Sequence, residues 1–448
     1  MLWFRRDLRL DDHPALDAAV AEADEVVPLF VLDPRLAGPS GAPRLAFLAG
    51  CLAELRDRTG GALVVREGDP AREVPRLAAE VGAGDVFVTG DFGPYGRERD
   101  AAVVEALAAD GRALRAVGSP YAATPGTVTK GDGSPFLVFS PYLRVWRSRT
   151  DRRAPARPVA DPRWATGVRS EALPMPPDLD ATAILPPGER AGRARLDRFL
   201  ADGLRTYAER RNTPAVEGTS RLSPYLKYGC VHPRTVLAGL GRGAGVDRLR
   251  AELAWRDFYG TILAARPDSA RAALRPAMED LRTDTGPAAD ERFSAWVEGR
   301  TGYPIVDAGM RQLAGEAWVH NRVRMVVASF LVKDLHLDWR RGARLFMERL
   351  QDGDLASNHH GWQWVAGTGT DPAPYVRVFN PVTQSERFDP DGTYVRRWVP
   401  ELEGVAAPDV HHPWTLPGGP PAGYPSPIVD HAAERREALA RYEAIGED

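Results

Sequence analysis

Cysteine and lysine are both scarce in this chain of 448 residues. Cys51 and Cys230 are the only cysteines and lie far apart, which fits a reducing cytosol and excludes a small disulfide-stapled domain. We therefore expect a cytoplasmic protein. Lysine occurs only at 130, 227 and 333, so nearly all positive charge is arginine. Arginine suits bidentate contacts to phosphate, although GC-rich coding would produce the same bias.

The sequence also lacks long apolar runs, a leader signal and spaced metal ligands. No run of 18 apolar residues occurs, which excludes a membrane-spanning helix. Charge appears within the first five residues without an apolar segment, so we expect no signal peptide. The histidine pairs at 359–360 and 411–412 are adjacent rather than four residues apart, so we expect no metal site. The net charge of −3 leaves any nucleic-acid contact to a local basic patch.

Short apolar runs alternate with helix-like segments over residues 1–118. The runs, rich in Val, Leu and Phe, lie at 2–4, 26–32, 63–66, 86–88 and 114–117. Between them, apolar periodicity predicts helices near 13–22, 43–58, 70–81 and 96–109. This alternation predicts an α/β domain with a parallel sheet covered by helices on both faces. No G-x-G-x-x-G follows the first strand, so we predict no dinucleotide site there.

The character of the chain changes after residue 118. Between 119 and 189 proline is frequent and periodicity is lost, which predicts a long interdomain linker. Its segment 136–146 is apolar enough to dock on a domain surface. Residues 190–448 predict an all-helical domain, with helices near 190–208, 223–228, 233–240, 246–265, 304–315, 317–336, 340–350 and 428–443.

The segment 339–364 combines three tryptophans with two carboxylates and an amide. Its D-G-D triplet at 352–354 predicts a tight turn, because glycine tolerates positive φ and aspartate bonds its own backbone. Asn358 and Trp362 are four residues apart and share a face if a helix follows. These side chains favour a pocket for a flat ring with polar edges; a buried helix with core tryptophans explains the segment equally well.

The stretch G-T-S-R-L-S at 218–223 places hydroxyls and a cation before Pro224. Ser223 followed by proline is a good helix start, with the hydroxyl at the N-cap. A helix N-terminus with further hydroxyls and an arginine favours an anion site. Simple capping is the alternative, and it explains Ser223 but not the other polar side chains.

Two further stripes carry polar groups on helix faces. Glu252, Trp255, Arg256 and Tyr259 share a face, which forms either an internal Glu–Arg bridge or a mouth with a stacking platform and an acid.

The second stripe joins Trp318, Asn321 and Met325, with Arg324 alongside. Its amide can hold the edge of a ring or of a base. Arg324 can pair with either aspartate of the triplet at 352–354.

These segments together resemble the photolyase/cryptochrome family. The resemblance covers essentially the whole chain and rests on W-F-R-R-D-L-R-L at 3–10, G-T-S-R-L-S at 218–223, E-L-A-W-R-D-F-Y at 252–259, T-G-Y-P-I-V-D-A-G-M-R-Q-L at 301–313, H-N-R-V-R-M at 320–325, D-G-D-L-A-S-N at 352–358 and G-W-Q-W at 361–364. The form at 320–325 is similar to class I cyclobutane pyrimidine dimer photolyases. The resemblance implies a monomeric lyase that repairs damaged DNA with light. The alternative is a cryptochrome-like receptor that binds FAD and signals without repair.

The resemblance also implies FAD buried in the helical domain and a pyrimidine dimer flipped toward it. It assigns to the flavin Tyr207, Thr219, Ser220, Arg221, Leu222, Ser223, Glu252, Arg324, Asp352, Asp354 and Asn358. It assigns to catalysis at the dimer Glu252, Trp255, Asn321 and Trp364, which supply polar contacts and stacking faces. The expected DNA interface adds the candidate phosphate contacts Arg256, Arg322 and Arg377.

A second, light-harvesting chromophore is implied for the first domain. P-Y-G-R-E-R-D at 94–100 resembles the branch that binds 8-hydroxydeazaflavin. The branch that binds methenyltetrahydrofolate, the alternative, has an Asn-Glu pair where Tyr95-Gly96 stand here. Lys227 occupies the place of a lysine in deazaflavin binders, and Arg44 and Asp91 are further candidates.

The resemblance finally implies electron transfer along tryptophans. Trp362 and Trp339 match the first two steps of the family's chain, whereas the third aligns to about Gly286. We expect another ring to replace the third, and Trp296 and Tyr303 are candidates because they follow that loop closely; the alternative is a chain that stops at Trp339.

Overall fold

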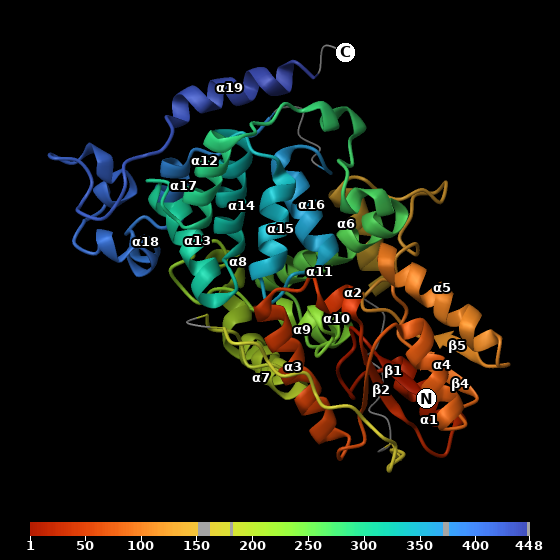
Figure 1. Cartoon of the computed structure of the whole chain (residues 1–448). Coiled ribbons are helices and arrows are strands. Elements are labelled where there is room, and N and C mark those ends of the chain that lie inside the picture. The colour runs from red at the N-terminus through yellow and green to blue at the C-terminus, as the bar shows by residue number, and fades with distance from the viewer. Residues whose placement is uncertain (151–161, 180–181, 371–375, 446–448) are drawn as a thin grey trace.

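The computed structural model describes residues 1–150, 162–179, 182–370 and 376–445 (Figure 1). An α/β part at the lower right of the view carries the N-terminus, and a bundle of helices fills the upper part. The last helix, α19 (His431–Glu443), crosses the top of the bundle. No helix among the described residues has both the length and the apolar character needed to span a membrane.

Five parallel strands form one sheet in the described α/β part, in the order β3-β2-β1-β4-β5. They are β1 (Leu2–Phe4), β2 (Pro28–Leu32), β3 (Val64–Glu67), β4 (Asp85–Val88) and β5 (Ala113–Ala116). The longer helices between them are α1 (Pro14–Glu22), α3 (Ala42–Arg58), α4 (Pro70–Glu80) and α5 (Pro94–Ala108), with the short α2 (Pro34–Ala37) before α3. The predicted strands, helices and α/β class are confirmed.

Both faces of the sheet are buried over β1 to β4, as the apolar runs require, whereas the edge strand β5 is mostly exposed. Leu2 and Phe4 of β1 face one hydrophobic core, and Trp3 between them faces the other. The strand order reverses direction around β1, with β2 on one side and β4 on the other. The loops that follow β1 and β4 therefore meet at a topological switch point, where open parallel sheets bind ligands.

The predicted linker contains a helix that sequence reasoning missed, α6 (Phe139–Thr150). It packs against α11 (Ala244–Ala265) of the bundle (Figure 1). Trp146 is fully buried, and its Nε1 donates to Asp257 Oδ2 at 2.8 Å. The expected docking of residues 136–146 thus takes helical form, because tertiary packing overrides a weak local pattern.

The bundle is built mainly from α11, α13 (Pro304–Glu316), α14 (Asn321–Ser329), α15 (Trp339–Arg349) and α16 (Leu355–Ala366). The shorter or peripheral helices are α7 (Glu189–Arg198), α8 (Tyr207–Arg210), α9 (Ser223–Lys227), α10 (Pro233–Ala238), α12 (Pro287–Val297), α17 (Pro381–Phe388) and α18 (Thr393–Trp398). The helix predicted over 317–336 begins only at Asn321. Ala317 takes a left-handed φ of 47° and ends α13 instead.

The two parts of the chain are joined closely near α9. Gly229 has a φ of 68°, and a Cβ there would overlap the backbone of Arg6. Both conditions require glycine. Beside it, Cys51 Sγ of α3 and Cys230 Sγ lie 3.5 Å apart, both buried.

Candidate active site

A partly buried ion pair and two orphaned oxygen atoms lie where α14 packs against α16 and the turn before it. Arg324 Nη2 of α14 is 3.7 Å from Asp352 Oδ1, as the sequence predicted. Asn358 of α16 is buried, and its Nδ2 donates to Ala343 O at 2.9 Å. Within the described residues, neither Asn358 Oδ1 nor Asp352 Oδ1 has a hydrogen-bond partner. Buried polar atoms are nearly always paired, so these two indicate a polar ligand.

Asp354 connects this centre to the α/β part. Its Oδ1 caps α16 by accepting from Ser357 N at 3.0 Å, and its Oδ2 lies 2.5 Å from Arg6 Nη2. Burial alone would raise the pKa of Asp354, but the charges of Arg6 and Lys227 outweigh it and hold that pKa far below its ordinary value. Asp354 is therefore a carboxylate at any physiological pH.

Gly353 between the two aspartates does not adopt the positive φ that the turn predicted. A Cβ at this position would stand 3.1 Å from Arg44 Cδ and 3.4 Å from Met347 Sδ. The glycine thus fits the close approach of α3 and α15, where a larger residue would push these two flexible side chains aside.

Glu252 forms the ion pair that its helix face suggested, but with a different arginine. Its Oε1 lies 2.7 Å from Arg211 Nη1, next to α8. Tyr207, at the start of α8, is buried, and the nearby Glu252 charge adds to burial in raising the pKa of its phenol. The carboxylate itself remains partly exposed, with 35% of its side-chain area accessible.

Three residues predicted at the dimer are accessible. Asn321 is exposed at the start of α14, with its Nδ2 4.0 Å from Met325 Sδ. Trp364 is half-buried on α16, and the Arg377 guanidinium lies 5.4 Å from its ring centroid. Trp255 is half-buried on α11 and stacks on Phe139, with centroids 3.7 Å apart and planes at 7°.

The structure does not support Arg256 as a phosphate contact. Its guanidinium donates to Pro120 O at 2.8 Å and Leu226 O at 3.0 Å, with only 12% of the side chain accessible. It holds the end of α9 against the loop after β5. Arg322 is also engaged, since its Nη2 donates to Asn212 Oδ1 at 3.1 Å, but its side chain stays partly accessible.

The loop 218–223 differs in detail from the prediction. Ser223 is the first residue of α9, Leu222 takes the N-cap position, and the helix is only five residues long. Arg221 has a φ of 49°, and its guanidinium pairs with Glu316 at 3.1 Å. Ser223 is exposed and Thr219 and Ser220 are half-buried, so hydroxyls rather than the arginine or a helix dipole remain for an anion.

The three residues predicted to hold a second chromophore converge at the switch point. Asp91 follows β4 and pairs with Arg99 at 3.2 Å. Burial would raise the pKa of Asp91, but neighbouring arginines hold it below its ordinary value. Burial, with Arg6 and Arg44 adding to it, lowers the pKa of Lys227 to about 7.

Gly96 leaves the room that the Asp91 carboxyl occupies, since a Cβ there would overlap it. A glutamate at position 96, as in the folate-binding pattern, would displace Asp91.

The tryptophans form a branched arrangement rather than a single line. Trp362 and Trp339 are both buried. A Cβ at Gly342 would overlap the Trp362 ring, so Trp362 packs against the turn of α15 that begins with Trp339. Trp296 also contacts Trp362, with centroids 6.2 Å apart, whereas Tyr303 contacts Phe330 and Trp414 instead.

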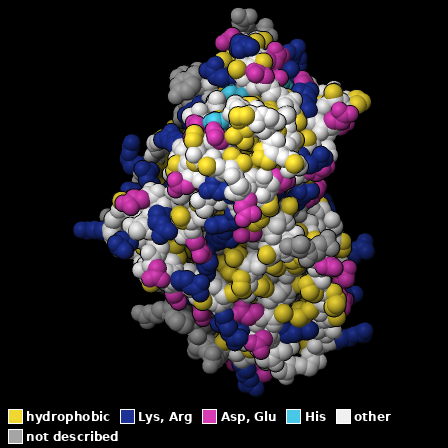
Figure 2. Space-filling view, turned by 90° about the vertical axis from the view of Figure 1, so that its left-hand side faces the viewer, with side chains coloured by type: hydrophobic (Ala, Val, Ile, Leu, Met, Phe, Trp, Pro, Cys, Tyr) yellow, Lys and Arg dark blue, Asp and Glu magenta, His cyan; other side chains and the backbone are white. Residues whose placement is uncertain are grey.

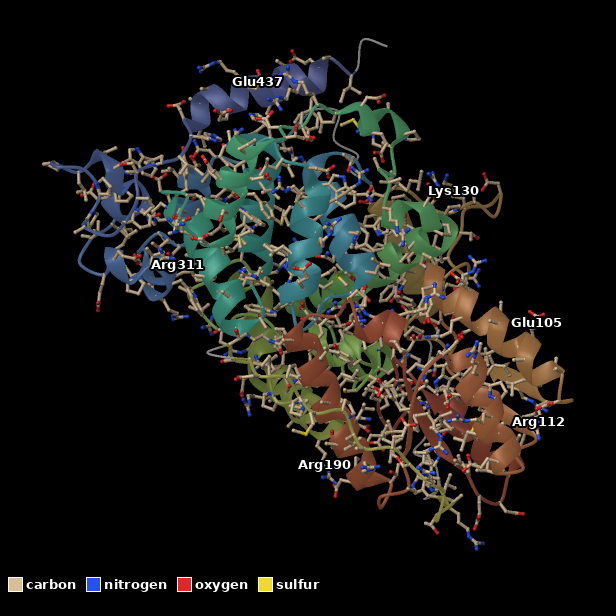
Figure 3. The ribbon with its side chains drawn as sticks, viewed as in Figure 1. Glu105, Arg112, Lys130, Arg190, Arg311 and Glu437 are labelled. Atoms are coloured by element: carbon tan, nitrogen blue, oxygen red, sulfur yellow. The ribbon has the colours of Figure 1, made fainter. Side chains whose placement is uncertain are left out.

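One surface depression lies outside this site. It has a volume of about 510 Å³ and is lined by α3 and α7, including Arg58, Glu189 and Arg190. Figure 3 shows Arg190 at the outer edge of the molecule. Glu189 accepts from Leu10 N at 2.7 Å and pairs with Arg58, so these charges fasten the loop after β1.

Sequence reasoning missed three residues of the site: Arg6, Arg211 and Phe139. Each comes from an element distant in sequence from its partner, and only the fold brings them together. Arg6 carried a signal, because it lies in the motif at 3–10 that matched the family's first loop, and Phe139 lies in the segment 136–146 that was expected to dock on a domain surface.

The comparisons with known proteins agree with this architecture. Residues 1–161 match the family described as DNA photolyase, and residues 249–444 match the FAD binding domain of DNA photolyase. A crystal structure of a class III photolyase from Agrobacterium tumefaciens has a TM-score of 0.93 and 38% identity, covering 100% of this chain and 97% of that one. The class I branch suggested by residues 320–325 stays a prediction.

An archaeal photolyase from Sulfolobus tokodaii, solved with two FAD molecules, has a TM-score of 0.84 and 30% identity, covering 99% of each chain. The deoxyribodipyrimidine photo-lyase of Streptomyces griseus is 46% identical over 457 residues, which cover 98% of this chain and 97% of that protein. Similarity at this level over the whole chain, on a parallel-sheet domain followed by an FAD-binding helical domain, shows that the chain belongs to the DNA photolyase family of repair enzymes.

Proposed function

We propose that this photolyase splits cyclobutane pyrimidine dimers with FAD held between α14, α15 and α16. One observation carries the proposal: α14 and α16 each bear one residue expected at the flavin and one expected at the DNA lesion. Asn321 and Trp364 reach the surface of these helices, whereas the partly buried Arg324 and the buried Asn358 lie at the orphaned polar atoms. A ligand bound within would therefore lie one helix width from DNA bound outside.

The residues present fit the flavin. The Asn358 amide oxygen and the Asp352 carboxylate would meet polar edges of the ring, and Arg324 would balance the aspartate charge. Tyr207 and the hydroxyls of Thr219, Ser220 and Ser223 would hold the remainder, including its phosphates. When bound and reduced, FAD supplies the electron that, after light absorption, opens the cyclobutane ring and is then returned.

The chain's own groups then act on the lesion. Trp255 and Trp364 offer ring faces to the extruded bases, which must leave the duplex to come near the flavin. Glu252 and Asn321 contact the pyrimidine edges, where negative charge develops. Arg322 and Arg377 contact phosphates beside the lesion. We propose that one molecule acts alone, in the cytoplasm.

The test is direct. Purified protein with reduced FAD is illuminated with an oligonucleotide that carries a single thymine dimer, and loss of the lesion is followed by chromatography. Repair in blue light and none in the dark is expected. A protein that binds FAD and the oligonucleotide but leaves the dimer intact under light would contradict repair and favour the receptor alternative.

We further propose that a second chromophore, 8-hydroxydeazaflavin, binds at the switch point beside Asp91, Lys227 and Arg44. The convergence of opposite charges at the ends of β1 and β4 supports a polar, flat ligand. The overlap between Asp91 and any side chain at 96 supports the deazaflavin over methenyltetrahydrofolate.

Reconstitution with each compound separates the two ligands. The deazaflavin should copurify with the protein and transfer excitation to FAD, and Lys227→Ala should lower its retention while FAD content stays the same. Retention of the folate instead would overturn the argument from Gly96.

A further inference from the structure

We propose that Phe139, the first residue of α6, is a positioning residue for Trp255 and thereby raises the affinity for damaged over undamaged DNA. The inference rests on the proposed function of Trp255 as a stacking face for the flipped lesion. It assigns a role in lesion recognition to the connector between the two domains.

The contact is a parallel stack. The ring centroids of Phe139 and Trp255 are 3.7 Å apart and their planes differ by 7°. Phe258 meets the Trp255 ring edge-on at 5.5 Å and 77°, and Phe258 also touches Phe139 at 5.7 Å. Phe139 covers one face of the indole, Phe258 lies against one edge, and the Tyr259 ring lies 5.3 Å away at a tilt of 39°. The ring plane is therefore held while part of the ring stays accessible.

The position of Phe139 is set two turns away along α6. Phe139, Tyr142 and Trp146 recur at helical spacing and lie on the face that meets α11. Tyr142 contacts Phe258 at 5.1 Å, and Trp146 Nε1 donates to the fully buried Asp257 carboxylate. The phenyl ring is therefore fixed by helix docking rather than by the exposed residues that precede it.

An indole that is already oriented gains affinity for the lesion. A free side chain at a binding surface must be ordered when its partner arrives, which weakens binding by a factor of about three to ten per side chain. Phe139 orders Trp255 beforehand, and it continues the stack of base and indole into the protein. Undamaged duplex extrudes no base onto Trp255, so the affinity of the protein for undamaged DNA should not depend on how well the Trp255 side chain is ordered.

The experiment compares dissociation constants for a thymine-dimer duplex and the same undamaged duplex, measured in the dark by fluorescence anisotropy on FAD-loaded protein. Phe139→Leu should weaken lesion binding by about three- to tenfold and leave undamaged binding unchanged. Phe139→Tyr should restore lesion binding, because it keeps the stacked ring. Phe136→Leu is the matched control: this half-buried phenylalanine of the same segment contacts Tyr142 at 6.3 Å. It should leave both constants unchanged.

A Trp255→Leu background separates positioning from general support. In that background, Phe139→Leu should not weaken lesion binding further, since the indole that Phe139 positions is absent. Equal loss for both DNAs, the same loss without Trp255, or tighter lesion binding by Phe139→Leu would each overturn the inference. Phe139→Met replaces Phe139→Leu if the latter loses FAD absorbance. A parent protein without preference for the lesion would contradict the proposed function itself, whereas a preference unaffected by Phe139→Leu would contradict only this inference.

Discussion

The surroundings of Lys227 destabilise the charged form of its side chain. Burial and the arginines Arg6 and Arg44 lower its pKa to about 7, although Asp354 and Asp91 pull in the other direction. A folded-state pKa below that of the unfolded chain, about 10.4, means that the unfolded chain binds more protons between those two values. The resulting destabilisation is complete below pH 7 and fades as the pH rises toward 10.

Replacing this lysine should therefore stabilise the fold, and more so at low pH. Lys227→Met should raise the thermal unfolding midpoint of the protein clearly at pH 6.5 and much less at pH 9.5. Scanning calorimetry of both proteins at the two pH values measures the difference. A difference in unfolding midpoint between variant and parent that does not decrease as the pH rises would contradict the lowered pKa of Lys227. Perturbed groups of this kind gather at functional sites, in agreement with a ligand at the switch point.

Glu252 should matter for repair rather than for the integrity of the flavin site. Glu252→Ala removes a carboxylate from the developing negative charge on the pyrimidine and frees Arg211. The yield of repair at saturating lesion should fall severalfold, while FAD absorbance per protein stays constant. Arg211→Gln is the control, since it removes the partner and keeps the carboxylate. An unchanged yield in Glu252→Ala would remove this residue from the reaction.

At the scale of single residues, sequence reasoning succeeded where partners lie within one motif. The shared face of Asn358 and Trp362 followed from their spacing in a helix, and Arg324 paired with Asp352 as expected. It failed where the partner comes from elsewhere. Arg256 was expected at DNA, but two backbone carbonyls from other elements take its donors, and no local pattern reports such contacts.

At the scale of elements, a buried hydrogen bond from Trp146 to Asp257 helps to hold α6 against α11. Burial raises the pKa of Asp257 to about 6, and the indole of Trp146 and the backbone of Ala123 donate to its carboxylate. Trp146→Phe removes one donor from a buried charge, which costs about 1–3 kcal/mol of stability.

The loss should be larger at pH 8 than at pH 5. A folded-state pKa above the unfolded value makes the charged form unfavourable in the fold, and protonation relieves it as the pH falls below about 6. Chemical denaturation of parent and Trp146→Phe at both pH values measures this. A loss independent of pH would show that packing of the indole, not its N–H, holds α6.

The packing of α12, α15 and α16 bears on photoreduction. Trp362 touches Trp296 of α12 and lies beside the turn of α15 that begins with Trp339. Trp296 is fully buried with its Nε1 donating to Val327 O at 3.0 Å, so the acceptor that faces its N–H is a backbone carbonyl. Gly286, at the place of the usual third ring, has a φ of 88° that tryptophan would not adopt without strain.

We therefore expect both neighbours of Trp362 to share the charge. Transient absorption after flavin excitation should show a tryptophan radical whose yield falls in Trp339→Phe and falls less in Trp296→Phe. The double variant should lose it. Tyr303→Phe serves as the control, because Tyr303 contacts a different set of rings. If Trp296→Phe leaves the radical yield unchanged, electron transfer from Trp362 runs through Trp339 and not through Trp296.

Elements with strong periodicity were predictable and those stabilised by distant contacts were not. The apolar runs of β1 to β4 must be buried on both faces, so their pattern is nearly independent of context. The helix α6 has a proline at its third residue and several arginines, and it forms because Tyr142 and Trp146 find a buried surface on α11. Its sequence alone shows no such surface.

At the scale of the molecule, charges of both signs are interspersed, as the face shown in Figure 2 illustrates. With a net charge of −3, attraction to DNA must come from local arginines. The logarithm of the lesion affinity should fall linearly with the logarithm of salt concentration. Arg377→Ala should reduce that slope by about one and weaken damaged and undamaged DNA alike. Titrations at several salt concentrations measure it, with Trp255→Ala as the control whose slope stays unchanged.

The facing thiols of Cys51 and Cys230 offer a way to watch the two halves of the enzyme separate. They are the whole cysteine content of the chain, both are buried, and they belong to opposite sides of the junction between sheet and bundle. A thiol-reactive dye would find no target in the closed molecule and two as soon as the junction parts, since burial raises the pKa of Cys51 and shields it. The labelling rate therefore reports how often the junction opens. A bound chromophore that contacts both halves would lower this rate.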